Sequence, residues 1–155
     1  MNPRIGNVHI DANALDRGGA ARGGDVDRFL ALVEADEISV VIPHSVKGEI
    51  AHPKTPDWVK LASNSQIFSL PVNRTPEEMA RLEDLRKLLR GNAQSDKHDA
   101  DAEHLFEASK YGGQFFVTHD KRILSKSKAI NALVGRIRIV TLEDFLRDYD
   151  RAGLQ

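Results

Sequence analysis

The stretch Phe-Phe-Val-Thr-His-Asp at residues 115–120 predicts a buried strand that ends close to a carboxylate. Val8-His9-Ile10 predicts a second short strand, and it ends directly at Asp11. Beyond these two segments, short apolar strands alternate with helical patterns along the whole chain. Because strands separated by helices form βαβ units, the alternation predicts an α/β fold with a mainly parallel sheet.

The other expected elements follow from apolar spacing and from helix start and stop signals. Thr75-Pro76-Glu77-Glu78 is typical of a helix start, and Gly91 of a helix end. Strands are expected at 5–10, 38–42, 115–118 and 136–140, with a minor strand or extended connector at 66–70. Helices are expected around 26–33, 44–51, 58–62, 76–90, 99–111, 121–130 and 142–149.

The composition is that of a globular domain. The chain has 155 residues, of which 41% are hydrophobic and 29% charged, so we expect a single domain over residues 1–155 and exclude disorder throughout. The absence of Cys excludes disulfides, a thiol nucleophile and thiolate metal sites. No apolar run approaches the ~20 residues that span a bilayer, and Met1-Asn2-Pro3-Arg4 lacks an apolar signal core. We therefore expect no membrane association and a cytoplasmic location.

Several acidic residues are predicted to meet at one edge of the sheet. In parallel sheets, ligands bind beyond the carboxyl ends of the strands, which is where Asp11 and Asp120 lie. The spacing of Val46, Glu49 and Ile50 places Glu49 beside the inward face of a helix. Asp101 lies next to Ala102, near the sheet-facing edge of another helix. Taken singly, each acid has an ordinary interpretation as a turn residue, a helix cap or a solvated helix edge.

A cluster of such acids requires charge compensation. Two carboxylates about 4 Å apart repel each other by roughly 4 kcal/mol at an effective dielectric constant of 20. The cluster is therefore stable only with shared protons or a cation, and oxygen ligands without Cys favour Mg²⁺ or Mn²⁺. Such a site can activate water and neutralise a phosphodiester, so phosphoryl chemistry is the natural inference.

The ordered set of motifs resembles that of the PIN-domain ribonucleases. It comprises Ile-Asp-Ala-Asn at residues 10–13, Glu49 after the second strand, Asp101-Ala102 opening a helix, and Phe-Val-Thr-His-Asp at residues 116–120. The resemblance extends from Val8 to Leu146. It implies a three-layer α/β/α fold and a metal-dependent endoribonuclease, a hydrolase of RNA phosphodiester bonds.

The resemblance also implies roles for individual residues. Asp11, Glu49, Asp101 and Asp120 would form the acidic site that binds Mg²⁺ or Mn²⁺, and Asn13 and Thr118 would support it through hydrogen bonds. Many small bacterial members of the family are toxins of toxin–antitoxin pairs, so an antitoxin protein and a homodimer are partners to expect.

Some alternatives stay open. Asp99 lies two residues before Asp101 and is the alternative third ligand. A helical insertion at about 52–92 could be a substrate clamp, a dimer surface or an ordinary insertion. The whole chain could be a catalytically silent module that binds RNA or protein. A phosphatase with Asp11 as its nucleophile is also conceivable, although that scheme normally needs a second acid where Asn13 stands.

A basic segment follows Asp120 directly. Between Lys121 and Arg138 there are six basic residues and no acid, in a chain of net charge −1. A solvated helix face is the ordinary interpretation. The functional one is that Lys121, Arg122 and Lys126 bind RNA phosphates. Zinc is not expected, because His98 and His104 would lie roughly 240° apart around a helix.

Overall fold

The computed structural model describes residues 2–11, 14, 20–42, 67–68, 74–91, 99–110, 113–135 and 137–154. Glu49 and Asn13, and the helices expected at 44–51 and 58–62, lie outside these ranges. Of the insertion expected at about 52–92, residues 67–68 and 74–91 are described.

The described strands form one parallel sheet, as expected. The strand order is β3-β2-β1-β4-β5, and each pair of neighbouring strands is parallel. The carboxyl ends of these strands therefore share one edge of the sheet. The strands are β1 (Asn7–Ile10), β2 (Ser39–Ile42), β3 (Ile67–Phe68), β4 (Gly113–Val117) and β5 (Arg138–Val140).

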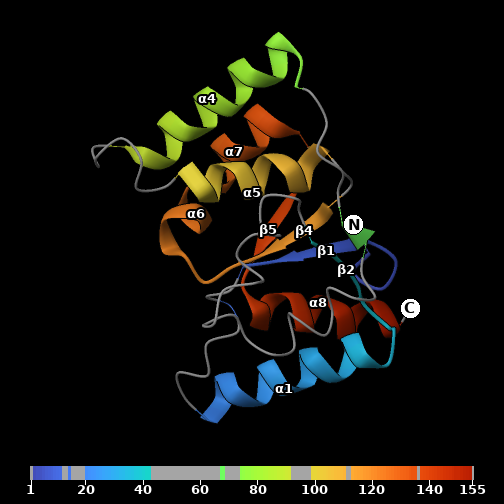
Figure 1. Ribbon diagram of the computed structural model, residues 1–155. Coiled ribbons are helices and arrows are strands. Elements are labelled where there is room, and N and C mark those ends of the chain that lie inside the picture. The colour runs from blue at the N-terminus through green and yellow to red at the C-terminus, as the bar shows by residue number, and fades with distance from the viewer. Residues whose placement is uncertain are drawn as a thin grey trace, which may run out of the picture.

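Helices cover both faces of the sheet, which confirms the three-layer α/β/α architecture (Figure 1). One face carries α1 and α8, and the other carries α5, α6 and α7. Helix α4 packs on α5 and α7, farther from the sheet than either (Figure 1). The helices in the described ranges are α1 (Ala20–Glu34), α4 (Pro76–Arg90), α5 (Asp99–Lys110), α6 (Lys121–Ser125), α7 (Ser127–Val134) and α8 (Leu142–Gly153). None of them is long and apolar enough to span a bilayer.

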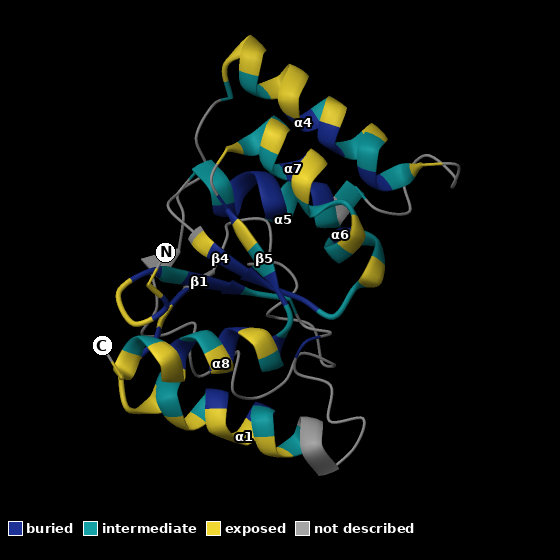
Figure 2. Cartoon of the chain, turned by 180° about the vertical axis from the view of Figure 1, so that it is seen from behind, coloured by how far each residue is buried: buried dark blue, intermediate teal, exposed yellow. Residues whose placement is uncertain are grey.

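The alternation of side chains along β4 divides the hydrophobic core into two parts. Phe115 and Val117 pack with Phe145 and the other apolar residues of α1 and α8. Phe116, between them, packs instead with the apolar residues of α4, α5, α6 and α7. Figure 2 shows the buried residues concentrated in the sheet and on the helix sides that face it. Strand β4 therefore packs against apolar residues on both of its faces.

Helix α4 begins and ends where the sequence predicts. The Thr75 hydroxyl accepts a hydrogen bond from the Glu78 N–H (3.2 Å), and the Glu78 carboxylate accepts one from the Thr75 N–H (3.3 Å). This reciprocal capping box satisfies two N–H groups that have no partner within the helix. Gly91 ends the helix with φ +53°, a conformation that glycine adopts without strain.

The expected helix over 121–130 is in fact two helices, α6 and α7. They are separated at Lys126, which has φ −102° and ψ 13°. The Ser125 hydroxyl donates to the Arg122 carbonyl (3.0 Å), and the Lys126 N–H closes a tight turn on the Ile123 carbonyl (3.2 Å). Serine near a helix end offers the backbone this local alternative, so a helical apolar pattern does not reveal the break.

Candidate active site

Parallel pairing of β1, β4 and β5 places Asp11 and Thr118 side by side. The Asp11 N–H donates to the Val117 carbonyl of β4 (2.8 Å), which continues the β1–β4 pairing one residue past β1. The Thr118 N–H in turn donates to the Val140 carbonyl of β5 (3.0 Å). Both residues therefore hold their positions through backbone hydrogen bonds at the carboxyl edge of the sheet.

The fully buried Thr118 hydroxyl connects two of the candidate acids. It donates to Asp11 Oδ2 (3.0 Å) and accepts from the Asp120 N–H (3.1 Å). A buried hydroxyl with both a donor and an acceptor partner is fixed in orientation. Thr118 thus makes the kind of supporting hydrogen bond that the family resemblance implies for it.

The Asp11 carboxyl has a raised pKa. Burial is the main cause, and the negative charge of Asp101 is the second. The hydrogen bond from Thr118 and the charge of His104 lower this pKa, and the charge of Asp120 raises it again. Asp11, Asp101 and Asp120 are therefore close enough to interact electrostatically at one edge of the sheet.

The two acids in the first turn of α5 have different surroundings. Asp99 pairs with Arg90 of α4, with 3.3 Å between Asp99 Oδ1 and the guanidinium nitrogen. Asp101 instead contributes to the charge around Asp11. Residues two positions apart lie about 200° apart around a helix, so only one of the two can face the sheet edge. This geometry favours Asp101 over Asp99 as the site residue.

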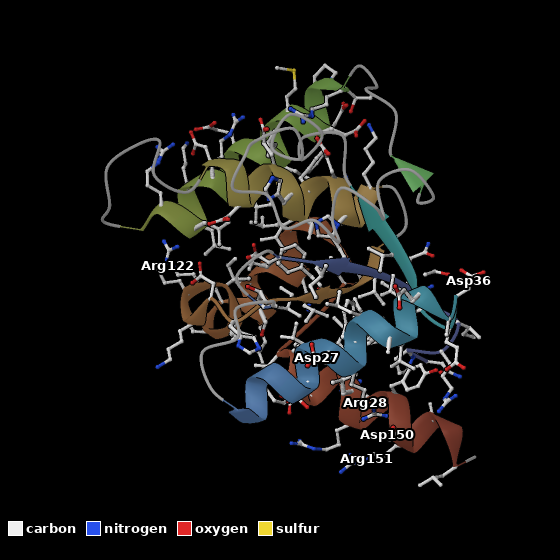
Figure 3. All side chains as sticks on the ribbon, turned by 60° about the horizontal axis from the view of Figure 1, so that its bottom comes forward. Asp27, Arg28, Asp36, Arg122, Asp150 and Arg151 are labelled. Carbon is white, nitrogen blue, oxygen red and sulfur yellow. The ribbon has the colours of Figure 1, made fainter. Side chains whose placement is uncertain are left out.

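Asp120 is the N-cap of α6, and its carboxylate accepts two hydrogen bonds from Arg122. Its Oδ1 accepts from the Arg122 N–H (2.9 Å), and its Oδ2 accepts from the Arg122 guanidinium (2.9 Å). The same guanidinium nitrogen lies 3.9 Å from Asp101 Oδ2. Arg122, in the first turn of α6, therefore links Asp101 of α5 to Asp120 at the start of α6 (Figure 3).

Two histidines near the acids were not predicted as site residues. His104 lies one turn after Asp101 on α5, and its charge acts on Asp11. The buried His9 ring stacks on Phe116, with 5.1 Å between the centroids, and its centroid is 6.5 Å from that of His104. The i, i+3 spacing of Asp101 and His104 is the sequence signal that could have identified His104.

The basic residues expected to contact RNA have different surroundings. Lys121 is exposed. Arg122 is bound to the acids. Lys126 donates from Nζ to the Leu88 carbonyl near the end of α4 (2.7 Å), where backbone carbonyls lack helical partners. This contact indicates a structural role for Lys126, and RNA contact by these three residues remains a prediction.

Lys126→Met should reduce the free energy of unfolding by about 1 kcal/mol, since the apolar stem is kept while the hydrogen bond to Leu88 is lost. Lys121→Met, the same change at an exposed neighbour, should change it by less than about 0.5 kcal/mol. Urea unfolding of both variants measures the difference. Equal stability of the two variants would show that the hydrogen bond from Lys126 to the Leu88 carbonyl does not stabilise the packing of α4 on the α6–α7 turn.

The donor set at this edge suits a hard divalent cation. Asp11, Asp101 and Asp120 offer only carboxylate oxygens, which Mg²⁺ and Mn²⁺ prefer. Burial first, and the negative charge of Asp101 second, raise the pKa of Asp11, so a cation beside it would favour its ionised form. Among the described residues, however, no three Asp, Glu or His side chains already form a group that could hold a metal ion. Glu49, the fourth predicted ligand, lies outside those residues.

Comparison with known proteins found no similarity: no family model, no curated protein and no solved structure matches this chain.

Proposed function

We propose that this protein is a metal-dependent endoribonuclease that hydrolyses RNA phosphodiester bonds with Mg²⁺ or Mn²⁺. The observation that carries the proposal is that Asp11, at the carboxyl edge of a parallel sheet, interacts electrostatically with Asp101 and Asp120, which Arg122 contacts in turn. That edge is where ligands bind in α/β folds of this kind. The order of these acids along the chain matches that of the PIN-domain ribonucleases, which supports RNA as the substrate.

The chain's own residues define how such a site would work. Asp11, Asp101 and Asp120, with Glu49 as predicted from the sequence, would hold the cation. When bound, the cation supplies positive charge to the phosphodiester and lowers the pKa of water. Thr118 keeps the Asp11 carboxylate oriented through its 3.0 Å hydrogen bond. His104 lies one turn after Asp101 on α5, and its charge lowers the pKa of Asp11.

The biological role that we propose is that of a toxin in a toxin–antitoxin pair, acting in the cytoplasm and restrained by a protein partner. The support for this finer part is the family resemblance of the sequence. Copurification of the chain with the product of an adjacent small gene, and loss of nuclease activity in that complex, would test it.

Purified protein should cleave a mixed pool of RNAs in Mn²⁺ or Mg²⁺ and should lose this activity in EDTA. Activity should return when the divalent cation is added in excess, because the chelator removes only the ion. Gel analysis of end-labelled RNA measures the cleavage. Binding without cleavage in every divalent cation tested would favour the silent RNA-binding module, and hydrolysis of an aryl phosphate instead of RNA would favour the phosphatase.

Asp101→Asn should reduce cleavage by roughly 100-fold or more, whereas Asp99→Asn should keep most of it. The reason is that Asp101 contributes to the charge around Asp11, while Asp99 pairs with Arg90. Initial rates of the two variants on one RNA give the comparison. Inactivity of Asp99→Asn alone would show that Asp99 is the ligand.

A further inference from the structure

Arg122 holds a position that a bound cation would also need. Its guanidinium donates to Asp120 Oδ2 at 2.9 Å and lies 3.9 Å from Asp101 Oδ2. Both carboxylates are candidate metal ligands, and both form an ion pair with the same guanidinium nitrogen. The positive charge of Arg122 therefore compensates part of the repulsion among the acids.

The geometry also gives the guanidinium a way to leave. The Arg122 side chain is 42% exposed, whereas that of Asp120 is 18% exposed, so the arginine extends toward solvent from the acid that it covers. Asp120 would stay in place without it. Its Oδ1 accepts from the Arg122 backbone N–H, a capping bond that does not depend on the guanidinium. If the guanidinium moved away, Asp120 Oδ2 would lose its hydrogen bond from Arg122, whereas Asp120 Oδ1 would keep its bond from the backbone N–H.

We propose that Arg122 is a resident counterion of the acidic site, which competes with a divalent cation for Asp101 and Asp120. The proposal rests on the proposed metal-dependent function. Binding of the cation displaces the guanidinium toward solvent, and the affinity of the site for metal is lower than the acids alone would give. The positively charged side chain then lies next to the bound ion, where an RNA phosphate would enter.

The test is the affinity of the RNA-free protein for Mn²⁺, measured by calorimetry on the wild type, Arg122→Gln and the control Lys121→Gln. Arg122→Gln should bind Mn²⁺ about tenfold more tightly, because no competing positive charge has to move. Lys121→Gln removes one positive charge from the exposed neighbour and should change the affinity by less than about twofold.

A second measurement separates a local effect from misfolding. In EDTA, Arg122→Gln should melt at a lower temperature than the wild type, because the acids lose their counterion. Saturating Mn²⁺ should then raise its melting temperature by more than it raises that of the wild type. Arg122→Lys, which keeps the charge but not the planar fork, should lie between the two.

The outcomes are distinguishable. If the wild type cleaves RNA with Mn²⁺ and Arg122→Gln binds Mn²⁺ no more tightly than Lys121→Gln, the counterion proposal is wrong and the proposed function stands. If no variant binds Mn²⁺ at millimolar concentration, both are wrong. If Arg122→Gln binds Mn²⁺ more tightly but the wild type does not cleave RNA, the counterion proposal is supported and the proposed ribonuclease function is wrong.

Discussion

Asp11→Asn is expected to reduce the rate of RNA cleavage by roughly 100-fold or more, while leaving the fold at least as stable as that of the wild type. Burial and the charges of Asp101 and Asp120 disfavour the ionised Asp11 carboxyl. The amide has nearly the same shape and its oxygen can still accept the hydrogen bond from Thr118. The variant therefore loses a negative charge that would bind the cation. It also loses the free-energy cost of keeping that charge buried in the folded protein.

The pH dependence of stability provides an independent measurement of the same residue. Because the pKa of Asp11 is higher in the folded than in the unfolded state, its ionisation destabilises the fold at neutral pH. This cost decreases as the pH falls below the folded-state pKa and is gone below the unfolded-state pKa. The stability difference between Asp11→Asn and the wild type should therefore shrink on acidification from pH 7.

Asp36→Asn is the matched control for Asp11→Asn. Asp36 is exposed and has φ +61°, a conformation that Asn also adopts readily. The control should keep the cleavage rate and the wild-type dependence of stability on pH. Near-wild-type cleavage by Asp11→Asn, measured beside this control, would remove Asp11 from the site.

Phe145→Ala is expected to cost about 3–5 kcal/mol of the free energy of unfolding, a large share of the ~5–15 kcal/mol typical of a domain. Phe145 of α8 is fully buried and makes edge-to-face contacts with two other rings. Its centroid is 5.5 Å from that of Phe115 in β4 and 6.1 Å from that of Phe29 in α1. Truncation would leave a cavity between the sheet and the two helices on that face.

Urea or thermal unfolding measures the effect of Phe145→Ala. The control is Leu154→Ala, since Leu154 follows the same helix and is 89% exposed. It should change stability by less than about 0.5 kcal/mol. A loss below about 1 kcal/mol for Phe145→Ala would mean that α8 does not close this part of the core.

The sequence predicted features that depend on neighbouring residues or on strand order. The helix start at Thr75-Pro76-Glu77-Glu78 is a local signal, and the structure confirms it and adds the capping box between Thr75 and Glu78. The meeting of Asp11 and Asp120 at one edge follows from parallel pairing, because strands of one direction end on one side. Asp101 was favoured over Asp99 for its position beside Ala102, which is fully buried against the core.

Other features depend on long side chains whose direction no spacing rule determines. Arg122 is a predicted RNA contact, and in the structure its guanidinium binds Asp120 and lies 3.9 Å from Asp101, 21 positions away in the sequence. The sequence does not predict this second contact. Lys126 reaches the Leu88 carbonyl across 38 positions. Such contacts depend on how whole helices pack. The sequence therefore does not predict the partners of Arg122 and Lys126, whereas strand direction and helix spacing predict where the acids lie.

The placement of α4 outside α5 and α7 means that stability is not uniform along this chain. α4 contacts α5 and α7, and its ion pairs reach α5 through Arg86 to Glu103 and Arg90 to Asp99. A helix in this position can open locally at a lower free-energy cost than the sheet. Its opening would remove the Arg90–Asp99 ion pair from the first turn of α5, where Asp101 also lies. The geometry of the candidate site would then depend on the opening equilibrium of a helix that contributes no residue to it.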